Sequence, residues 1–304
     1  MIGSWLQAAR PLAQVNIAGP LLLGQAMAFG YCGAFSARRL AWLAGFGLLA
    51  HLFIVLANDH ADREADAHIT THNEFSGGSR VIIEGKLSAR TVGLAALAVL
   101  AALITLGLAA LAAGLGPWML FGSCAAALLL WLYSYPPARA SYRGHGAALQ
   151  GLGVGVVLPL VGLLTQAGIA GLWSMPALAL LPPFVLGYAG NILTALPDAP
   201  GDRAAGKRTY PVVRGQWTAR RHLLELLLLC ACATPLVLPQ LPLPLVALVA
   251  ATPTALALTC VPLLGSADAE NREECRQFVL RGGAAQVATA LAWSLALVVT
   301  RLVG

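Results

Sequence analysis

The sequence predicts an all-α integral membrane protein, and three observations support this fold class. Hydrophobic residues make up 58% of the 304 residues and charged residues only 11%, whereas soluble domains carry about 25% charged residues. Nine apolar segments are each long enough to cross about 30 Å of hydrocarbon as a helix. The basic residues also fall almost entirely in alternate loops between these segments. A soluble two-domain protein, which the length alone would permit, is therefore excluded.

The nine expected transmembrane helices account for most of the chain, which we treat as a single domain covering residues 1–304. The expected spans are residues 12–33, 40–57, 91–113, 117–135, 148–168, 175–196, 222–238, 242–264 and 281–302.

Polar or helix-breaking residues delimit several of these segments. We do not expect the first, 12–33, to be a cleavable signal peptide, because it is long, contains Asn16 and Pro20, and leads directly into another span. The second ends where Asn58 follows an apolar run. The fourth ends before Pro136, since a proline pair cannot continue a helix.

The later segments are defined mainly by hydropathy. The sixth, 175–196, ends just before Asp198, and the seventh, 222–238, is the shortest of the nine. The loops at 114–117, 169–174 and 239–242 carry no charge. These uncharged loops would all lie on one side of the membrane.

The distribution of charge predicts the orientation of the chain. With nine spans, 16 of the 19 basic residues fall on one side, and only Arg38, Arg39 and Arg301 fall on the other. The positive-inside rule places the first side in the cytoplasm. All 13 acidic residues lie on that side or at its edge. We therefore expect a cytoplasmic N-terminus in a bacterial inner membrane, and the net charge of +6 does not indicate a nucleic-acid partner.

The first acidic cluster follows the second span. Asp59, Asp62 and Asp66 would lie close to one face of a helix, with Asn58 beside them. Unpaired carboxylates at this spacing repel one another, so a cation or several arginines must compensate their charge. The cluster therefore predicts a site for a hard divalent cation.

The second acidic cluster follows the sixth span and pairs Asp198 with Asp202, again at a spacing of i and i+4. Lys207 and Arg208 come shortly after it. Carboxylates that hold a cation, followed by bases that meet phosphate oxygens, suit a metal-bound diphosphate. Because four helices separate the two clusters, we also expect two four-helix pseudo-repeats plus one helix.

These motifs resemble those of the UbiA superfamily of intramembrane prenyltransferases, over residues 10–215 of the chain. The resemblance is carried by Asn58-Asp59-x-x-Asp62-x-x-x-Asp66, Tyr133-x-x-Pro136-Pro137-x-Arg139 and Asp198-x-x-x-Asp202, with support from Arg10-Pro11 and from residues 20–24 in the first span.

The resemblance implies a fold of about nine helices around a central cavity, with Mg²⁺ as the cofactor. The donor would be a polyprenyl diphosphate, and both substrates would be used within the lipid bilayer. By position in the motifs, the implied metal-binding residues are Asn58, Asp59, Asp62, Asp66, Asp198 and Asp202. Of these, Asp62, Asp66, Asp198 and Asp202 would be catalytic, and the diphosphate would be bound by Arg80, Tyr133, Arg139, Lys207 and Arg208.

The resemblance also suggests an acceptor. Residues 68–80 resemble the naphthoate-prenylating, menaquinone branch of the family, which implies an aromatic quinone precursor such as dihydroxynaphthoate. Ala147 departs from the pattern, because many relatives have an acidic residue there. The group that would take the proton from the acceptor is therefore open.

Two other functions are compatible with parts of the sequence. An intramembrane terpene cyclase would ionise the same diphosphate but let the cation attack its own double bonds. A transporter that couples substrate and ion movement would need carboxylates deep inside its helices. The carboxylates of this chain cluster instead at one membrane face, which favours transfer or cyclisation over transport.

Overall fold

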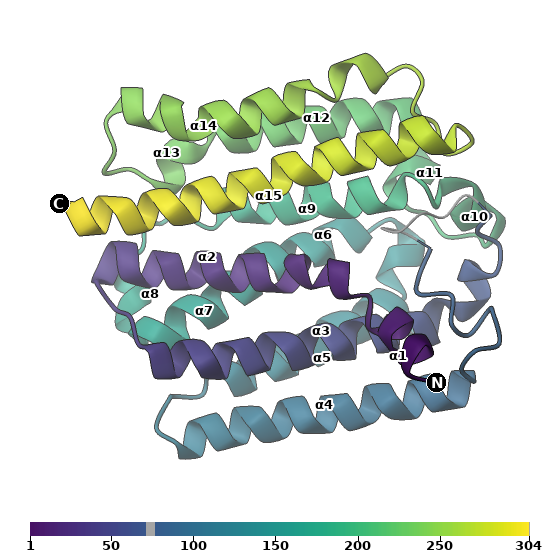
Figure 1. Cartoon of the computed structure of the whole chain (residues 1–304), viewed down its shortest axis with the longest axis horizontal. Helices are drawn as coiled ribbons and strands as arrows, with labels where there is room; N and C mark the ends of the chain where they lie inside the picture. The colour runs from purple at the N-terminus through teal and green to yellow at the C-terminus, as the bar shows by residue number, and fades with distance from the viewer. Residues whose placement is uncertain (71–76, 304) are drawn as a thin grey trace.

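The structure, a computed structural model, describes residues 1–70 and 77–303, and all regular secondary structure in these residues is helical. The long helices run side by side along one axis (Figure 1). In chain order the α-helices are α1 (Ile2–Ala9), α2 (Val15–Cys32), α3 (Ala37–Asp66), α4 (Ala89–Ala112), α5 (Trp118–Ser134), α6 (Gly146–Leu152), α7 (Leu158–Ala167), α8 (Ala170–Ser174), α9 (Leu181–Ala195), α10 (Ala199–Ala204), α11 (Tyr210–Arg214), α12 (Gln216–Cys232), α13 (Thr234–Val237), α14 (Leu243–Leu258) and α15 (Arg272–Val303).

The predicted all-α membrane fold is confirmed, and each of the nine expected spans overlaps at least one helix, although residues 175–180 of the sixth form a non-helical turn. Within the described residues, six helices are long and apolar enough to cross a membrane, and a seventh apolar helix, α5, is shorter. The six are Ile2–Cys32, Ala37–Asp66, Ala89–Ala112, Gly146–Ala167, Leu243–Leu263 and Arg272–Val303. The sixth and seventh expected spans correspond to the shorter helices α9 and α12. The count of nine crossings therefore stays a prediction.

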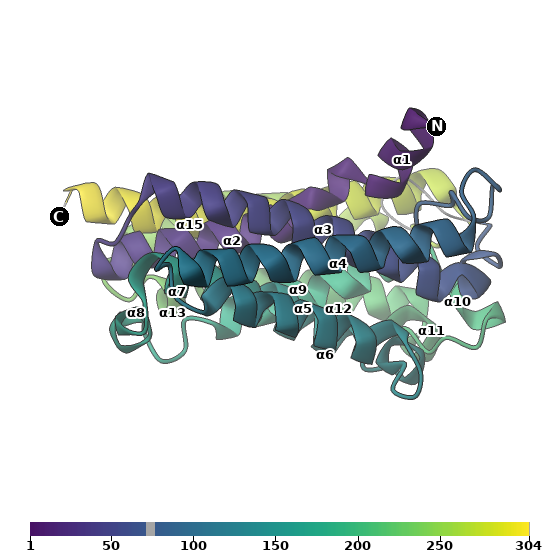
Figure 2. The same ribbon diagram turned by 90° about the horizontal axis from the view of Figure 1, so that it is seen from below.

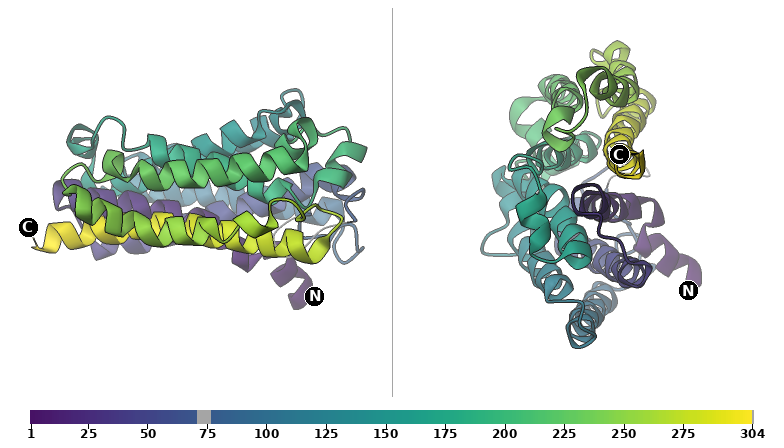
Figure 3. Two further views of the ribbon diagram at one scale, coloured as in Figure 1. Left: turned by 90° about the horizontal axis from the view of Figure 1, so that it is seen from above. Right: turned by 90° about the vertical axis from the view of Figure 1, so that its left-hand side faces the viewer.

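The helices surround a common interior when the bundle is viewed along its axis (Figure 3, right). Helix α2 packs against α7 and α15, α3 packs against α4, and α6 packs against α9. One hydrophobic core joins residues of α2 to those of α3, α4 and α5, and a second joins α2 to α9, α12 and α15. The two cores meet at α2, which places this helix beside the interior of the bundle.

The N- and C-termini lie at opposite ends of the bundle (Figure 1), and α1 projects from one side of the bundle (Figure 2) while it contacts α3. Helix α3 ends at the same end of the bundle as α10 and α11 (Figure 1). This end therefore collects the residues that follow the second and sixth expected spans.

A π-helical turn, η3 (Gly153–Val157), joins α6 to α7 and lets this helical segment approach α9 closely. A Cβ atom at Gly155 would lie 2.2 Å from the carbonyl oxygen of Pro183, and one at Gly187 would lie 3.2 Å from the Cα of Gly151. Glycine is required here because any side chain would force the two helices apart. The close contact fixes the inner faces of α6 and α9 relative to each other.

Candidate active site

The first acidic cluster lies in the last turns of α3, which continues beyond the expected membrane span 40–57 through Asp66. The helical spacing puts Asn58, Asp62 and Asp66 on one face, and all three line a cavity of about 300 Å³. Asp62 is 2% exposed and Asp66 is 8% exposed. A carboxylate this deeply buried needs a compensating charge or hydrogen-bond donors.

The second acidic cluster lines the same cavity. Asp198 directly precedes α10 and Asp202 lies within it. The Thr209 hydroxyl donates a hydrogen bond to Asp202 Oδ2 at 2.9 Å, and the Gly77 N–H donates to Asp198 Oδ2 at 3.0 Å. The fold therefore brings together two carboxylate pairs that are far apart in the sequence.

Lys207 lies between the two clusters. Its Nζ is 3.0 Å from Asp62 Oδ2 and 4.0 Å from Asp202 Oδ1, and its side chain is 11% exposed. Burial lowers the pKa of Lys207, but the carboxylates of Asp62 and Asp202 outweigh burial and hold the pKa well above its ordinary value. Burial likewise raises the pKa of Asp202, although Lys207 and Thr209 act in the opposite direction. The ammonium group thus holds the place where a cation would neutralise both clusters.

Tyr142 completes the surroundings of Asp62, and its role was not predicted from the sequence. Its hydroxyl donates to Asp62 Oδ1 at 3.1 Å, while the Asn58 amide donates to Asp62 Oδ2 and to the Ser134 hydroxyl, each at 3.1 Å. Burial and the Asp62 charge raise the pKa of Tyr142 to about 12, so the phenol stays protonated and keeps donating.

Asp59 is placed differently from the other acidic residues. It does not line the cavity; it accepts the Ser79 N–H at 3.1 Å through Oδ1 and 3.3 Å through Oδ2. It is 4% exposed. Its carboxylate therefore holds the segment after residue 77 against α3.

The predicted phosphate-binding residues, unlike most of the acidic residues, do not all line the acidic cavity. Arg80 donates through its guanidinium to the Ile69 carbonyl at 3.2 Å and lines a second, larger cavity. The guanidinium of Arg139 lies 4.2 Å from the centre of the Tyr142 ring, with its buried Nε lacking a hydrogen-bond partner in the described residues. Arg208 is exposed. Tyr133, in contrast, lines the acidic cavity and accepts the Asn191 amide at 2.9 Å.

The side chains around the acidic cavity fit Mg²⁺ by their chemistry. Carboxylate and amide oxygens from Asn58, Asp62, Asp66, Asp198 and Asp202 all face it, and Mg²⁺ prefers oxygen ligands. Within residues 1–70 and 77–303, however, no three His, Cys, Asp or Glu side chains converge closely enough to hold a metal ion. The carboxylate oxygens of Asp62 accept hydrogen bonds from the Lys207 ammonium, the Tyr142 hydroxyl and the Asn58 amide.

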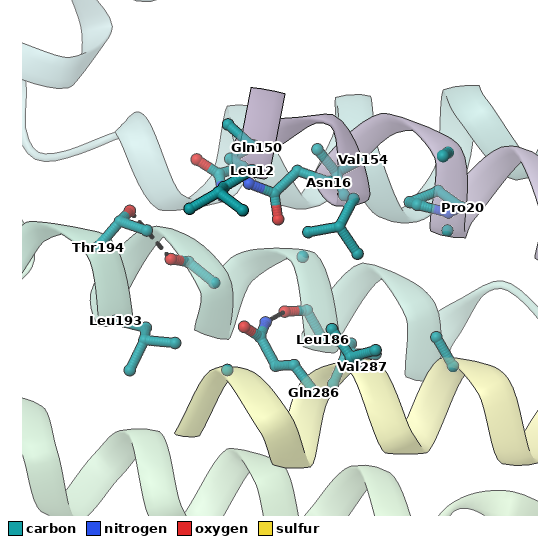
Figure 4. Close-up of a pocket in the computed structure, with 18 of the residues that line it drawn as sticks. Leu12, Asn16, Pro20, Gln150, Val154, Leu186, Leu193, Thr194, Gln286 and Val287 are labelled. Atoms are coloured by element: carbon teal, nitrogen blue, oxygen red, sulfur yellow. Dashed lines mark hydrogen bonds between the residues drawn. The ribbon is translucent and has the colours of Figure 1, made fainter. Parts of the chain in front are cut away.

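A larger, mainly apolar cavity of about 990 Å³ adjoins the acidic one (Figure 4). Arg10, Asn16, Gly78, Gln150 and Thr194 line both cavities. The larger cavity extends between α2, α9 and α15. A molecule with a charged head and a long apolar tail could therefore place one part in each.

Comparison with known proteins identifies relatives of the whole chain. The model of the UbiA prenyltransferase family matches residues 17–284. No curated protein sequence matches the chain.

Several solved structures share the fold. A UbiA homolog from Archaeoglobus fulgidus bound to GPP and Mg²⁺ superimposes with a TM-score of 0.69, at 18% sequence identity, over 97% of this chain and 99% of that one. The apo structure of a UbiA homolog from Aeropyrum pernix K1 matches with a TM-score of 0.61, at 15% identity, over 88% of this chain and 97% of that one. A digeranylgeranylglyceryl phosphate synthase matches with a TM-score of 0.62, at 15% identity, over 98% of each chain.

Proposed function

Because the chain belongs to the UbiA prenyltransferase family, we propose that it transfers a polyprenyl group from a polyprenyl diphosphate to an aromatic acceptor within the membrane, with Mg²⁺ as cofactor. One observation carries the proposal: the two acidic clusters and Lys207 line one small cavity that adjoins a large apolar cavity. A relative of the same fold is bound to GPP and Mg²⁺, which supports a prenyl diphosphate as donor.

The metal ligands in this proposal are Asn58, Asp62, Asp66, Asp198 and Asp202, with Asp59 supporting the first group through Ser79. Mg²⁺ bound there would neutralise the charge that develops on the leaving diphosphate. The chemistry of the side chains supports this assignment, since each offers a carboxylate or amide oxygen to the same cavity.

Lys207 would act on the diphosphate. In the structure its ammonium is held by Asp62 and Asp202. Once those carboxylates bind a cation, the ammonium can turn to the phosphate oxygens, where a positive charge stabilises the leaving group. We assign Arg80, Arg139 and Arg208 to the outer phosphate oxygens, since they lie around rather than within the acidic cavity.

The reaction then needs few further groups from the protein. The allylic C–O bond breaks with its electron pair leaving on the diphosphate, and the aromatic ring of the acceptor forms the new C–C bond and loses a proton. The apolar walls of the larger cavity keep water away from the allylic cation. The rings of Tyr133 and Tyr142, beside the acidic cavity, would face that cation and stabilise it.

We further propose a bacterial inner membrane as the location, with the site at the cytoplasmic face, and a quinone precursor such as dihydroxynaphthoate as the acceptor. The concentration of basic residues in alternate loops supports the orientation. The resemblance of residues 68–80 to the naphthoate-prenylating branch supports this choice of acceptor. Residues 71–76 of this stretch lie outside the described residues.

Replacement of Asp62 and of Asp198 by alanine tests the proposal. We expect each change to abolish Mg²⁺-dependent release of diphosphate from geranyl diphosphate by the purified protein. Glu64→Ala is the matched control, because Glu64 lies on the same helix as Asp62, pairs with Arg63 and has a side chain that is 79% exposed. Diphosphate release that survives both aspartate changes would contradict the proposed site.

A terpene cyclase is the second candidate, favoured by the size of the apolar cavity, which could hold a folded polyprenyl chain. The two functions share the ionisation step and differ in what captures the cation. Incubation of the protein with polyprenyl diphosphate and Mg²⁺ but no acceptor separates them. A cyclic hydrocarbon product would replace the transferase proposal.

A further inference from the structure

Two glutamine side chains lie near each other in the wall of the larger cavity, one on each side of Gly190. Gln150 comes from α6 and Gln286 from α15, and both are half-buried (Figure 4). Gly190 of α9 lies between them, where a Cβ atom would be 2.9 Å from Gln286 Nε2 and 3.3 Å from Gln150 Nε2. The absence of a side chain at residue 190 therefore leaves room for both amides.

Hydrogen bonds determine which atom each glutamine leaves available. Gln286 Nε2 donates to the Leu186 carbonyl at 2.7 Å, so its Oε1 remains as an acceptor. Gln150 Oε1 accepts the Asn191 amide at 3.0 Å, so its Nε2 remains as a donor. In the part of the chain that the structure describes, neither remaining atom has a hydrogen-bond partner.

The pair is connected to the acidic cavity. Asn191 Nδ2 also donates to the Tyr133 hydroxyl at 2.9 Å, and Gln150 lines both cavities. Around the glutamines the wall combines the apolar side chains of Leu186, Leu193 and Val287 with the polar side chains of Asn16 and Thr194 (Figure 4). The charged residues of this cavity are Arg10, Arg80 and Glu84, from the N-terminal segment and the connection after α3.

We propose that Gln150 and Gln286 bind a neutral hydroxyl group on the aromatic acceptor. The hydroxyl oxygen would accept from Gln150 Nε2, and its hydrogen would be donated to Gln286 Oε1. A carboxylate does not fit this pair, because it has no hydrogen to donate to Gln286 Oε1. The inference rests on the proposed function, since it assigns the acceptor to the apolar cavity beside the ionisation site.

Binding of two small aromatic probes tests the inference on the full-length protein in detergent. The probes are 1-naphthol and 1-methoxynaphthalene, which differ in that only the naphthol can donate a hydrogen bond. We expect the wild-type protein to bind 1-naphthol about tenfold more tightly, since an unmet buried hydrogen bond costs about 1–3 kcal/mol and about 1.4 kcal/mol corresponds to a factor of ten.

The variant Gln286→Leu should bind both probes about equally. Gly190→Ala should have the same effect without removing a polar group, because the added Cβ would push the two amides apart. Gln277→Leu is the matched control, since Gln277 lies on the same helix, bonds to Glu273 at the surface and does not line the cavity. It should keep the full preference for 1-naphthol.

Equal binding of the two probes by the wild-type protein would overturn the inference, as would a preference that survives both Gln286→Leu and Gly190→Ala. A failure of the proposed function would be detected by a different measurement, the release of diphosphate. The control Gln277→Leu should still release diphosphate from geranyl diphosphate, whereas release by Asp62→Ala would refute the ionisation site and leave the probe result standing.

Discussion

Replacing Lys207 by methionine should destabilise the metal-free protein, and Mg²⁺ should restore most of the lost stability. The Lys207 ammonium lies 3.0 Å from Asp62 Oδ2 and 4.0 Å from Asp202 Oδ1, and both carboxylate side chains are 3% exposed. Removing one member of a buried ion pair costs about 3–5 kcal/mol, because the remaining charge stays buried without compensation. Methionine fills a similar volume, so the loss should come mainly from the charge.

Mg²⁺ should bind the variant more tightly than the wild type, because it no longer competes with the ammonium for Asp62. A cation that binds only the folded state stabilises it according to its concentration and affinity. Thermal unfolding in detergent, measured with and without Mg²⁺, should therefore show a larger Mg²⁺-dependent increase in Tm for Lys207→Met than for wild type. The variant should nevertheless lose activity, since Lys207 is the buried cation nearest the proposed diphosphate.

The matched control is Lys86→Met. Lys86 pairs with Glu84 at 2.6 Å, but their side chains are 47% and 37% exposed, and exposed pairs contribute about 0–1 kcal/mol. The stability of Lys86→Met should therefore differ little from that of the wild type, with or without Mg²⁺. Equal Mg²⁺ effects on wild type and Lys207→Met would refute the reasoning, because they would show that the cation does not bind the carboxylates that Lys207 contacts.

Two further changes test the site and the fold. Tyr142→Phe removes the hydrogen bond to Asp62 Oδ1. The loss of about 1.5 kcal/mol of transition-state stabilisation should reduce Mg²⁺-dependent turnover about tenfold, as measured by steady-state kinetics. Unchanged turnover would rule out a role for the hydroxyl. Gly155→Ala would place a Cβ 2.2 Å from a backbone carbonyl of α9 and should lower stability in denaturant unfolding by about 1–3 kcal/mol. Gly153→Ala is the control, because its Cβ would lie 3.4 Å from Leu129 and its stability should change little. Equal losses of stability in the two alanine variants would argue against close packing of this helical segment on α9.

Hydropathy and charge predicted the helical segments well, because a membrane span must be long, apolar and free of charge. They predicted helix ends less well. Helix α3 runs on through Asp66, since nothing in residues 58–66 breaks a helix and the carboxylates there gain partners from distant segments. Helices α9, with 15 residues, and α12, with 17, are shorter than the six helices that are long enough to cross a membrane, and hydropathy alone does not show whether they cross it.

The acidic residues of the site could be predicted because charge beside an apolar helix is unusual and needs compensation. The hydrogen-bond partners of these acidic residues could not be predicted. Tyr142, Thr209 and the backbone N–H of Ser79 reach the carboxylates through the tertiary fold, and nothing in their local sequence marks them. The same holds for Gln150 and Gln286, which are single polar residues within apolar segments until the packing of α6, α9 and α15 brings them together.

The central claim is that both acidic clusters bind the same metal–diphosphate group. The most direct measurement is a structure of the protein with Mn²⁺ in place of Mg²⁺ and an unreactive geranyl diphosphate analogue, with anomalous scattering to locate the metal. The account predicts Mn²⁺ peaks within the cavity bounded by Asp62, Asp66, Asp198 and Asp202, with Lys207 turned toward the phosphates. Mn²⁺ bound outside this cavity, or at one cluster while Lys207 still pairs with the other, would contradict it.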